Sequence, residues 1–322
     1  MIPELEQFQN LLKEELKNLG LNKEPKSLYQ PIEYIISLGG KRLRPMLTLL
    51  ACGLYDDPEK AMPQALAVEV FHNFSLMHDD IMDNAPLRRG QQTVHEKWDI
   101  NTAILSGDAA LVKSYELLAQ CDARLLPELL ALFNKTAVEV CEGQQLDVEF
   151  ELRDNVSEDE YIQMIQLKTS VLLGCALRMG AIVGRAPKTD AEHLYQFGLL
   201  LGTAFQIKDD VLDCFGESAK VGKQVGGDII SNKKTLLLIH ALNTATGDTL
   251  NQLNDWLGRT EFDAEEKVRS VKSIYLELGT EAFANQRMAD YYAEAISHLD
   301  LLSAKNKKPL YNFAEWLFKR DN

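Results

Sequence analysis

The sequence predicts an all-α protein, and three observations support this fold class. Apolar residues recur at intervals of three and four, as at Leu194, Phe197 and Leu201, which is the spacing of one helix face. The 322 residues include only 10 prolines, and no Ser/Gly-rich linker or low-complexity tract interrupts them. No stretch alternates apolar and polar residues for long enough to predict a β-strand. We therefore expect about ten or more helices.

Glycine, proline and acidic residues mark where these helices end. In chain order, we expect breaks at Gly39–Gly40, Asp56–Pro58, Pro86–Gly90, Asp154–Ser157, Gly184–Pro187 and Gly216–Gly227. A new helix should begin near Pro45, because proline is favoured in the first turn. Two predicted helices, Ala61–Met82 and Leu172–Val183, are apolar nearly all the way round, which is typical of helices that others surround. No boundary divides the chain, so residues 1–322 are predicted to form a single domain.

Composition and charge exclude several classes of protein. The chain is 46% hydrophobic and 25% charged, as globular proteins are. Its 34 Lys and Arg against 48 Asp and Glu give a net charge of −14, so we expect no nucleic-acid partner. The five cysteines form no C-x-x-C pair, and the acidic N-terminus has no signal-peptide pattern, so we expect a cytoplasmic protein. The longest apolar run, Val171–Gly184, contains Arg178, so no membrane span is expected.

Two acidic clusters with the same spacing are the most informative pattern in the chain. The pattern Asp-Asp-x-x-Asp follows a long apolar run at Asp79, Asp80 and Asp83, and again at Asp209, Asp210 and Asp213. In a helix, the first and last Asp of each cluster lie about 40° apart on one face. Like charges at this spacing destabilise a helix unless a positive group offsets them.

One such cluster in an acidic protein is more often a solvated helix face. Two identically spaced copies favour a shared role in metal binding. Mg²⁺ is a hard cation that suits carboxylate oxygens, and the phosphate oxygens of a substrate can complete its coordination.

Basic residues gather where an anion would bind. Lys41, Arg42 and Arg44 crowd the predicted helix start, where the helix dipole disfavours cations by about 0.3–1 kcal/mol each. Arg88 and Arg89 follow the first acidic cluster, and they either pair with its carboxylates or serve the same anion. The second cluster is flanked by Lys168, Lys223, Lys233 and Lys234. Alternating acidic clusters and basic loops favour a site for a metal–diphosphate complex.

Two neutral residues lie on the same helix faces as the clusters. His72 precedes Asp79 by seven residues and lies about 20° from it around the helix. Gln206 precedes Asp210 by one turn. Each is either a structural residue of its helix or part of the site.

These segments resemble, in order and spacing, the trans-type isoprenyl diphosphate synthases (the farnesyl, geranylgeranyl and polyprenyl diphosphate synthases). The resemblance rests on GGKRLRP, HNFSLMHDDIMD with RRG, GQQLD, KT, FQIKDDVLD and GKQVGGDIISNKKT, and it extends from Ser37 to about Asp290. It implies a helical bundle around a deep central cavity, and a homodimer. It also implies a Mg²⁺-dependent prenyltransferase that condenses isopentenyl diphosphate with an allylic diphosphate (dimethylallyl, geranyl or farnesyl).

The resemblance implies a role for individual residues. About three Mg²⁺ ions would bind Asp79, Asp83 and Asp209, with support from Asp80, Asp210 and Asp213. Isopentenyl diphosphate would be held by Lys41, Arg44, His72 and Arg89. The allylic diphosphate would be held by Arg88, Lys168, Lys223 and Lys233. The catalytic set would be Lys168, Thr169, Gln206 and Lys233, in which Thr169 and Gln206 direct oxygen atoms toward the developing allylic cation. Gln144 and Asp147 of GQQLD would support the first cluster.

Three residues before the first cluster are predicted to set the product length: Phe71, Phe74 and Ser75. In the resembling family, an aromatic residue five positions before the first Asp limits growth, and a small residue four before it permits more. Phe74 and Ser75 occupy these positions, although Phe74 lies away from the Asp face on an ideal helical wheel. The first cluster also lacks the two-residue insertion of typical bacterial farnesyl synthases. We expect the C20 product geranylgeranyl diphosphate, with C15 farnesyl diphosphate or a longer polyprenyl product as alternatives.

Other classes are less consistent with the sequence. A terpene cyclase of the same fold would carry an Asn/Ser/Glu metal motif in the second helix, where this chain has DDVLD. A non-catalytic homologue would have lost motif residues, and none is missing. A structural or Ca²⁺-binding bundle would not release diphosphate from the two substrates in a Mg²⁺-dependent reaction.

Overall fold

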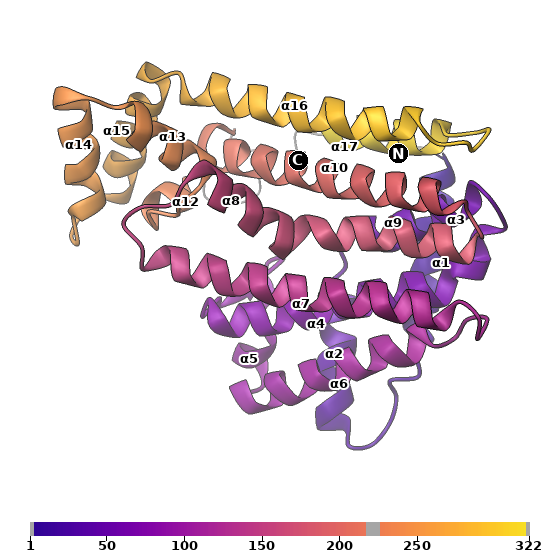
Figure 1. Cartoon of the computed structure of the whole chain (residues 1–322). Coiled ribbons are helices and arrows are strands. Elements are labelled where there is room, and N and C mark those ends of the chain that lie inside the picture. Colours follow the sequence, from indigo (N-terminus) through magenta and orange to yellow (C-terminus); the bar gives the residue numbers. More distant parts are fainter. Residues whose placement is uncertain (1–2, 217–225, 320–322) are drawn as a thin grey trace. The chain divides into compact units, whose positions relative to one another are not determined.

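The computed structural model describes residues 3–216 and 226–319, which are almost entirely helical (Figure 1). The only strands in these ranges are β1 (Leu87–Arg88) and β2 (Gln91–Gln92). The all-α class predicted from the sequence is confirmed. By its internal contacts the chain divides into two compact units, of which the first comprises Met1–Lys135, Leu172–Tyr195 and Leu301–Asn312 and the second comprises the rest. The single domain over residues 1–322 stays a prediction.

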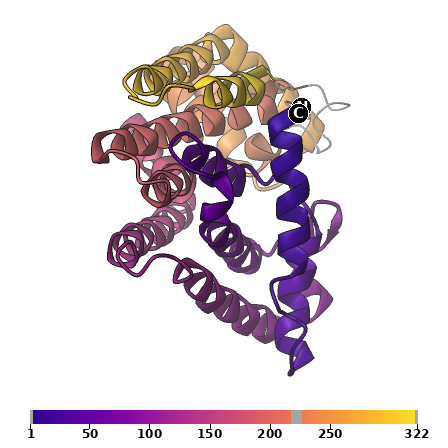
Figure 2. The same cartoon turned by 90° about the vertical axis from the view of Figure 1, so that its right-hand side faces the viewer.

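The first unit is organised around α4 (Met62–Met82), which packs against every helical element of the first unit from α1 to α6. These elements are α1 (Pro3–Lys17), α2 (Lys26–Ser37), α3 (Leu43–Gly53), the 3₁₀ turn η1 (Pro58–Ala61), α5 (Val94–Lys97) and α6 (Ile100–Leu118). Every residue from Gln64 to Phe71 is buried, which confirms the prediction that this helix is surrounded. Figure 2 shows α1, in indigo, along its length; it packs on α3 and α4.

The second unit is built from the later part of the chain and has a core of its own. α7 (Leu126–Glu151) begins in the first unit, to which α9 (Val171–Val183) also belongs. The other elements are α8 (Glu158–Ile165), the π-helical segment η2 (Gln166–Ser170), most of α10 (Lys188–Phe215), α12 (Gly227–Ile230), α13 (Leu236–Thr244), α14 (Gly247–Gly258), α15 (Ala264–Glu277), α16 (Thr280–Asp300) and part of α17 (Lys308–Lys319). Buried side chains of α8, α13, α14 and α15, among them Tyr161 and Trp256, form one hydrophobic cluster.

Local sequence explains where several helices begin. Ser157 and Glu160 form a reciprocal capping box at the start of α8, directly after the predicted break at Asp154–Ser157. Asp99 caps α6 by accepting a hydrogen bond from the Thr102 amide at 2.8 Å. The helix predicted to begin near Pro45 begins at Leu43.

The hairpin of β1 and β2 was not predicted from the sequence. Leu87 pairs with Gln92 and Arg88 with Gln91, and the two turn residues, Arg89 and Gly90, have φ of 53° and 75°. A two-residue turn with positive φ at both positions matches the twist of the strands it joins. The sequence gives little sign of this turn because arginine rarely adopts positive φ.

One helical stretch, Glu158–Val183, has the length of a membrane span, with a mean hydropathy of 1.2. However, 72% of its apolar window is buried inside the protein. This pattern is typical of the core helix of a folded domain.

Candidate functional site

The first acidic cluster lies at the C-terminal end of α4, and its three carboxylates have different environments. Asp83 is exposed at the helix end, Asp79 is half-buried and Asp80 is 1% exposed. Arg88 makes a forked ion pair with Asp80, from Nε at 2.8 Å and from Nη2 at 2.7 Å. Arg88 therefore pairs with a carboxylate of the cluster, which was one of the two alternatives that the sequence left open.

The hairpin brings Arg89 to the glycine pair before α3. Arg89 Nη1 donates a hydrogen bond to the carbonyl of Gly39. A Cβ atom at Gly40 would lie 2.9 Å from Arg89 Nη2, and Gly40 itself has φ of 128°. Only glycine fits this position, because a side chain would need an unusual backbone conformation and would also clash with Arg89. Lys41 follows in the same loop, half-buried.

Arg44 and His72 join α3 to α4. Arg44 Nη1 lies 3.2 Å from His72 Nε2, and burial lowers the pKa of Arg44 to about 10. Burial, and then the positive charges of Arg44, Arg89, Arg88 and Arg42, hold the pKa of His72 well below its ordinary value. At neutral pH His72 is therefore an uncharged acceptor. Arg44 Nε is buried and has no hydrogen-bond partner among the described residues.

A buried network fixes the loop that carries these cations. Arg42, with φ of 51°, forms an ion pair with Glu69 of α4 and donates to the carbonyl of Ile36. Asn73 donates to Glu69 Oε1 at 3.0 Å. Glu69 and Asn73 were not predicted from the sequence as residues of the site. The one available signal was an acidic residue inside an otherwise apolar helix.

The second acidic cluster lies near the C-terminal end of α10 in the second unit. Asp209 is exposed, whereas Asp210 is buried and accepts a hydrogen bond from the hydroxyl of Tyr161. Gln206 Nε2 lies 3.3 Å from Asp210 Oδ1. Burial raises the pKa of Asp210 to about 7, against the opposing effect of Lys233.

Asp213 holds the chain that enters α12. Its carbonyl accepts from the Gly226 amide at 2.7 Å, and its Oδ2 atom accepts from the Asp228 amide at 3.0 Å. The Asp228 carbonyl in turn accepts from the amide of Lys233 at 2.9 Å, and the side chain of Lys233 is exposed. Asp213 thus supports the loop of a predicted substrate-binding lysine. Lys223, the other predicted lysine of this region, lies outside the described residues.

Lys168 and Thr169 lie in the π-helical segment η2, where α7 approaches very closely. A Cβ atom at Gly143 would lie 2.1 Å from the Lys168 amide nitrogen, so only glycine permits this approach. Lys168 Nζ forms an ion pair with Asp147 one turn further along α7. Gln144 is 7% exposed, and both polar atoms of its side chain lack a partner in the described part of the chain.

The predicted length-determining residues of α4 belong to an aromatic group. Phe71 is buried edge-on against Phe133 of α7, with ring centroids 5.2 Å apart. The ring centroid of Phe74 lies 5.5 Å from that of Phe71 and 4.8 Å from that of His78. The hydroxyl of Ser75 donates to the carbonyl of His72 at 3.0 Å.

The acidic residues fit Mg²⁺ by their chemistry. No group of three or more His, Cys, Asp or Glu side chains is preassembled for a metal within residues 3–216 and 226–319. Mg²⁺ needs no such group, because proteins usually bind it through one or two carboxylates together with substrate phosphates and waters. Exposed carboxylates such as Asp83 and Asp209 are suited to this mode.

The structure therefore distributes the predicted site over the two units. The first unit brings together the first acidic cluster and the predicted residues Lys41, Arg44, His72, Arg88 and Arg89. The second unit contains the second acidic cluster and the predicted residues Gln144, Asp147, Lys168, Thr169, Gln206 and Lys233.

Comparison with known proteins gives consistent matches over the whole chain. Residues 25–275 match the polyprenyl synthetase family. A geranylgeranyl pyrophosphate synthase of Geoglobus acetivorans is 36% identical over 316 residues, 97% of each chain. A geranylgeranyl diphosphate synthase of Methanosarcina mazei is 37% identical, over 92% of this chain and 91% of that protein. The crystal structure of a geranylgeranyl pyrophosphate synthase is 45% identical, covers 99% of both chains and superimposes with a TM-score of 0.94.

Proposed function

Because the chain belongs to the polyprenyl synthetase family, we propose that it condenses isopentenyl diphosphate with an allylic diphosphate to make all-trans geranylgeranyl diphosphate. The observation that carries this proposal is the cationic cluster around His72. This cluster consists of Arg42, Arg44, Arg88 and Arg89, which lie close enough to lower the pKa of His72, about two helical turns before Asp79 on α4. A buried guanidinium nitrogen without a protein partner, Arg44 Nε, suits an anionic ligand.

We assign the diphosphate of isopentenyl diphosphate to Lys41, Arg44, His72 and Arg89. The hydrogen bond from Arg89 to the Gly39 carbonyl supports this assignment, because it keeps Arg89 beside the segment that contains Lys41 and Arg44. We assign the allylic diphosphate to Arg88, Lys168, Lys223 and Lys233. Arg88 and Lys168 are each oriented by a carboxylate, Asp80 and Asp147 respectively.

The metal ligands that we propose are Asp79, Asp83 and Asp209, with Asp80, Asp210 and Asp213 in support. The supporting role fits the contacts of these carboxylates with the protein. Asp80 pairs with Arg88, Asp210 accepts a hydrogen bond from Tyr161, and Asp213 accepts one from the Asp228 amide. The chemistry that Mg²⁺ supplies when bound is neutralisation of the diphosphate charge, which makes diphosphate a better leaving group.

The residues of the chain then act by binding, orientation and exclusion of water. The allylic C–O bond breaks, and its electron pair leaves with the diphosphate. The double bond of isopentenyl diphosphate attacks the resulting allylic cation and forms the new C–C bond. A proton lost from the adduct passes to the departing diphosphate and restores a double bond. Thr169 and Gln206 direct oxygen atoms toward the cation, and apolar side chains keep water away from it.

For the product we propose a C20 chain, with Phe71, Phe74 and Ser75 of α4 limiting its length. The names of the two curated relatives and of the matching crystal structure support this length. Phe74 is held by aromatic contacts with Phe71 and His78, so its ring has a defined position.

We also propose that the chain acts as a cytoplasmic homodimer. Support comes from α6, where Ile100, Ile104, Leu105 and Val112 are 41–60% exposed on one helix. Apolar side chains gathered on one surface helix are typical of an interface. Sedimentation of Leu105→Glu/Val112→Glu should give the monomer mass, while the wild type gives twice that mass. An unchanged dimer would exclude this face.

The catalytic proposal is tested with purified full-length protein, radiolabelled isopentenyl diphosphate and each of the three allylic primers. We expect Mg²⁺-dependent formation of a C20 product from each primer, and no product after addition of EDTA. Asp79→Asn should lower kcat by about 10²–10³-fold, which is typical for loss of one transition-state electrostatic contact. Asp248→Asn, an exposed change on α14, is the control. Absence of any condensation product would overturn the proposal.

A further inference from the structure

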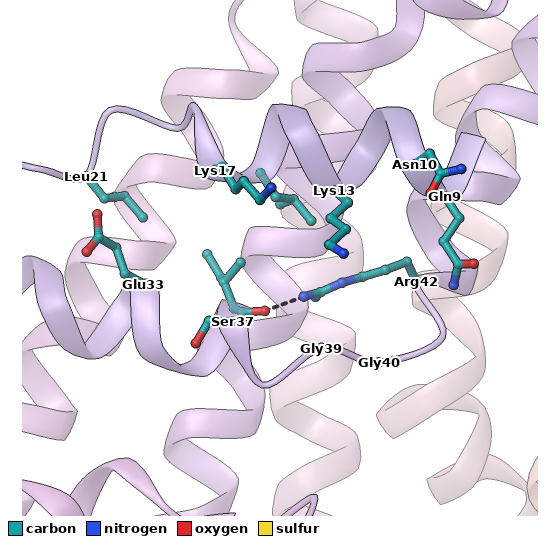
Figure 3. A pocket seen from close by; sticks show the side chains of 12 residues that line it. Gln9, Asn10, Lys13, Lys17, Leu21, Glu33, Ser37, Gly39, Gly40 and Arg42 are labelled. Carbon is teal, nitrogen blue, oxygen red and sulfur yellow. Dashed lines mark hydrogen bonds between the residues drawn. The ribbon is translucent and has the colours of Figure 1, made fainter. Parts of the chain in front are cut away.

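A hollow of about 580 Å³ lies in the first unit between α1, α2 and the loop that joins α2 to α3 (Figure 3). None of the residues to which we give a substrate or metal role lines it. Its volume is within the usual range for sites that bind small metabolites. Its lining residues are distinct from His72 and the arginines around it.

Two lysines of α1 face this hollow without strong partners. Lys13 is exposed and makes no hydrogen bond or ion pair with the described residues. Figure 3 shows its side chain extending from α1 toward Arg42. Lys17, one turn further along, pairs with Glu14 alone among the described residues, at 2.8 Å, and both side chains are more than 60% exposed. Such an exposed ion pair contributes little free energy, so Lys17 can exchange Glu14 for a stronger anion.

The rest of the lining adds two requirements for a ligand. Glu33 is the one acidic side chain among the lining residues, and it lies beside Leu21 at the end of the hollow away from Arg42 (Figure 3). It has no hydrogen-bond partner in the described part of the chain, so it favours a ligand that also donates hydrogen bonds. A ligand with a phosphate group that binds Lys13 and Lys17, and with hydroxyl groups that donate hydrogen bonds to Glu33, meets both requirements.

The wall opposite α1 is the loop between α2 and α3, which contains Lys41 and leads into Arg44 of α3. Gly39, Gly40 and Arg42 line the hollow on one side. On its other side, the Gly39 carbonyl accepts a hydrogen bond from Arg89. This hydrogen bond is the contact that couples the loop to Arg89. A ligand that shifts the loop therefore acts on Lys41, which lies in the loop, and on Arg89, which is hydrogen-bonded to it.

We propose that this hollow is a regulatory site for a small hydroxylated phosphate ester, and that occupying it changes the affinity of the chain for isopentenyl diphosphate. The binding part stands on the geometry of the hollow alone, whereas the regulatory part rests on the proposed function.

The first experiment measures binding of glucose 6-phosphate to the full-length protein by calorimetry in EDTA, without substrates. Lys13→Ala/Lys17→Ala should weaken binding by at least about tenfold, equivalent to about 1.4 kcal/mol. The matched control, Lys23→Ala/Lys26→Ala, removes two exposed lysines outside the hollow and should bind like the wild type. Ser37→Phe fills the hollow without changing its charge and should also abolish binding. Equal affinity in the wild type and the double variant would overturn the proposal.

A second probe tests the role of Glu33. Inorganic phosphate has no hydroxyl groups for this carboxylate, so Glu33→Gln should weaken binding of glucose 6-phosphate and leave that of inorganic phosphate unchanged. An equal effect on both probes would contradict the ligand class that we propose.

The third experiment measures the KM for isopentenyl diphosphate with and without glucose 6-phosphate. In the wild type we expect a change of at least about fivefold, the lower end of typical coupling between two sites. In Lys13→Ala/Lys17→Ala the ligand should have no effect, while kcat without ligand equals that of the wild type. A double variant that still responds would refute regulation from this hollow. A chain that binds the probe in EDTA but makes no prenyl product would refute the proposed function alone.

Discussion

Arg44 and His72 hold each other across α3 and α4, with Arg44 Nη1 at 3.2 Å from His72 Nε2. Because arginine can only donate, His72 accepts through Nε2 and must be uncharged for the contact to form. The contact therefore depends on pH.

Stability should fall as the pH drops below about 6.5, the ordinary pKa of histidine. The pKa of His72 is lower in the folded than in the unfolded chain, so the unfolded chain takes up the proton first. Protonation of His72 lowers the free energy of unfolding by up to about 1.4 kcal/mol per pH unit. The decrease stops once the pH is below the pKa of His72 in the folded chain. Urea unfolding at pH 7.5 and pH 5.5 measures the change. His72→Gln should reduce the pH dependence, whereas the control His193→Gln should keep it. If the free energy of unfolding of His72→Gln changed with pH as steeply as that of the wild type, His72 would not be the source of the pH dependence.

The buried ion pair of Arg42 and Glu69 should be far more important for stability than an exposed one. The two side chains are 9% and 3% exposed, so Arg42→Ala leaves a buried carboxylate without its cation. We expect a loss of about 3–5 kcal/mol in the free energy of unfolding. Lys17→Ala removes an exposed pair with Glu14 and should lose no more than about 1 kcal/mol. If urea unfolding showed the same loss of stability for both variants, the buried ion pair would have no special importance for stability.

Phe74→Ala should lengthen the product beyond C20, because it removes an aromatic ring beside Phe71 and His78. Chromatography of the products of a reaction with excess isopentenyl diphosphate measures the length. Phe74→Tyr keeps the ring and serves as the control. An unchanged product from Phe74→Ala would remove Phe74 from the length-determining group.

Lys267 should position the lysines that follow α12. It is fully buried on α15, and its Nζ atom donates to Asn232 Oδ1 at 2.7 Å and to the Ile230 carbonyl at 3.1 Å. Lys267→Met leaves these acceptors without a donor and should lose about 1–3 kcal/mol of stability. It should also raise the KM of the allylic substrate more than that of isopentenyl diphosphate, since Lys233 directly follows Asn232.

Arg269→Met, an exposed change on the same helix, is the control for both measurements. Equal increases in the two KM values would indicate general destabilisation rather than positioning.

The positions of the acidic clusters could be predicted because their signal is local. Each cluster ends a long apolar run with helical spacing, and α4 and α10 indeed end at Met82 and Phe215. The five predicted breaks from Gly39–Gly40 to Gly184–Pro187 were predictable for the same reason, since glycine, proline and capping residues act on their own neighbours in sequence. The sixth, Gly216–Gly227, lies largely outside the described residues.

The partners of the site residues could not be predicted, because they depend on which helices cross. Tyr161 contacts Asp210 across 49 positions of the chain, and neither residue shows this in its local sequence. The turn at Arg89 escaped prediction because its positive φ is set by the hairpin rather than by the preference of arginine.

The π-helical segment η2 has a consequence for how α8 faces α10. Nine residues of regular α-helix turn by about 900°, which would leave Tyr161 and Ser170 on opposite faces. Yet Tyr161 bonds Asp210 of α10, and the Ser170 side chain accepts from Thr203 of the same helix at 3.3 Å. A π turn contains more residues than an α-helical turn, so each residue rotates less about the axis, and Ser170 stays on the side that faces α10. A regular helix with one residue fewer would turn by about 800° between the two positions and leave them about 80° apart, so the π turn accommodates one additional residue while both side chains still face α10.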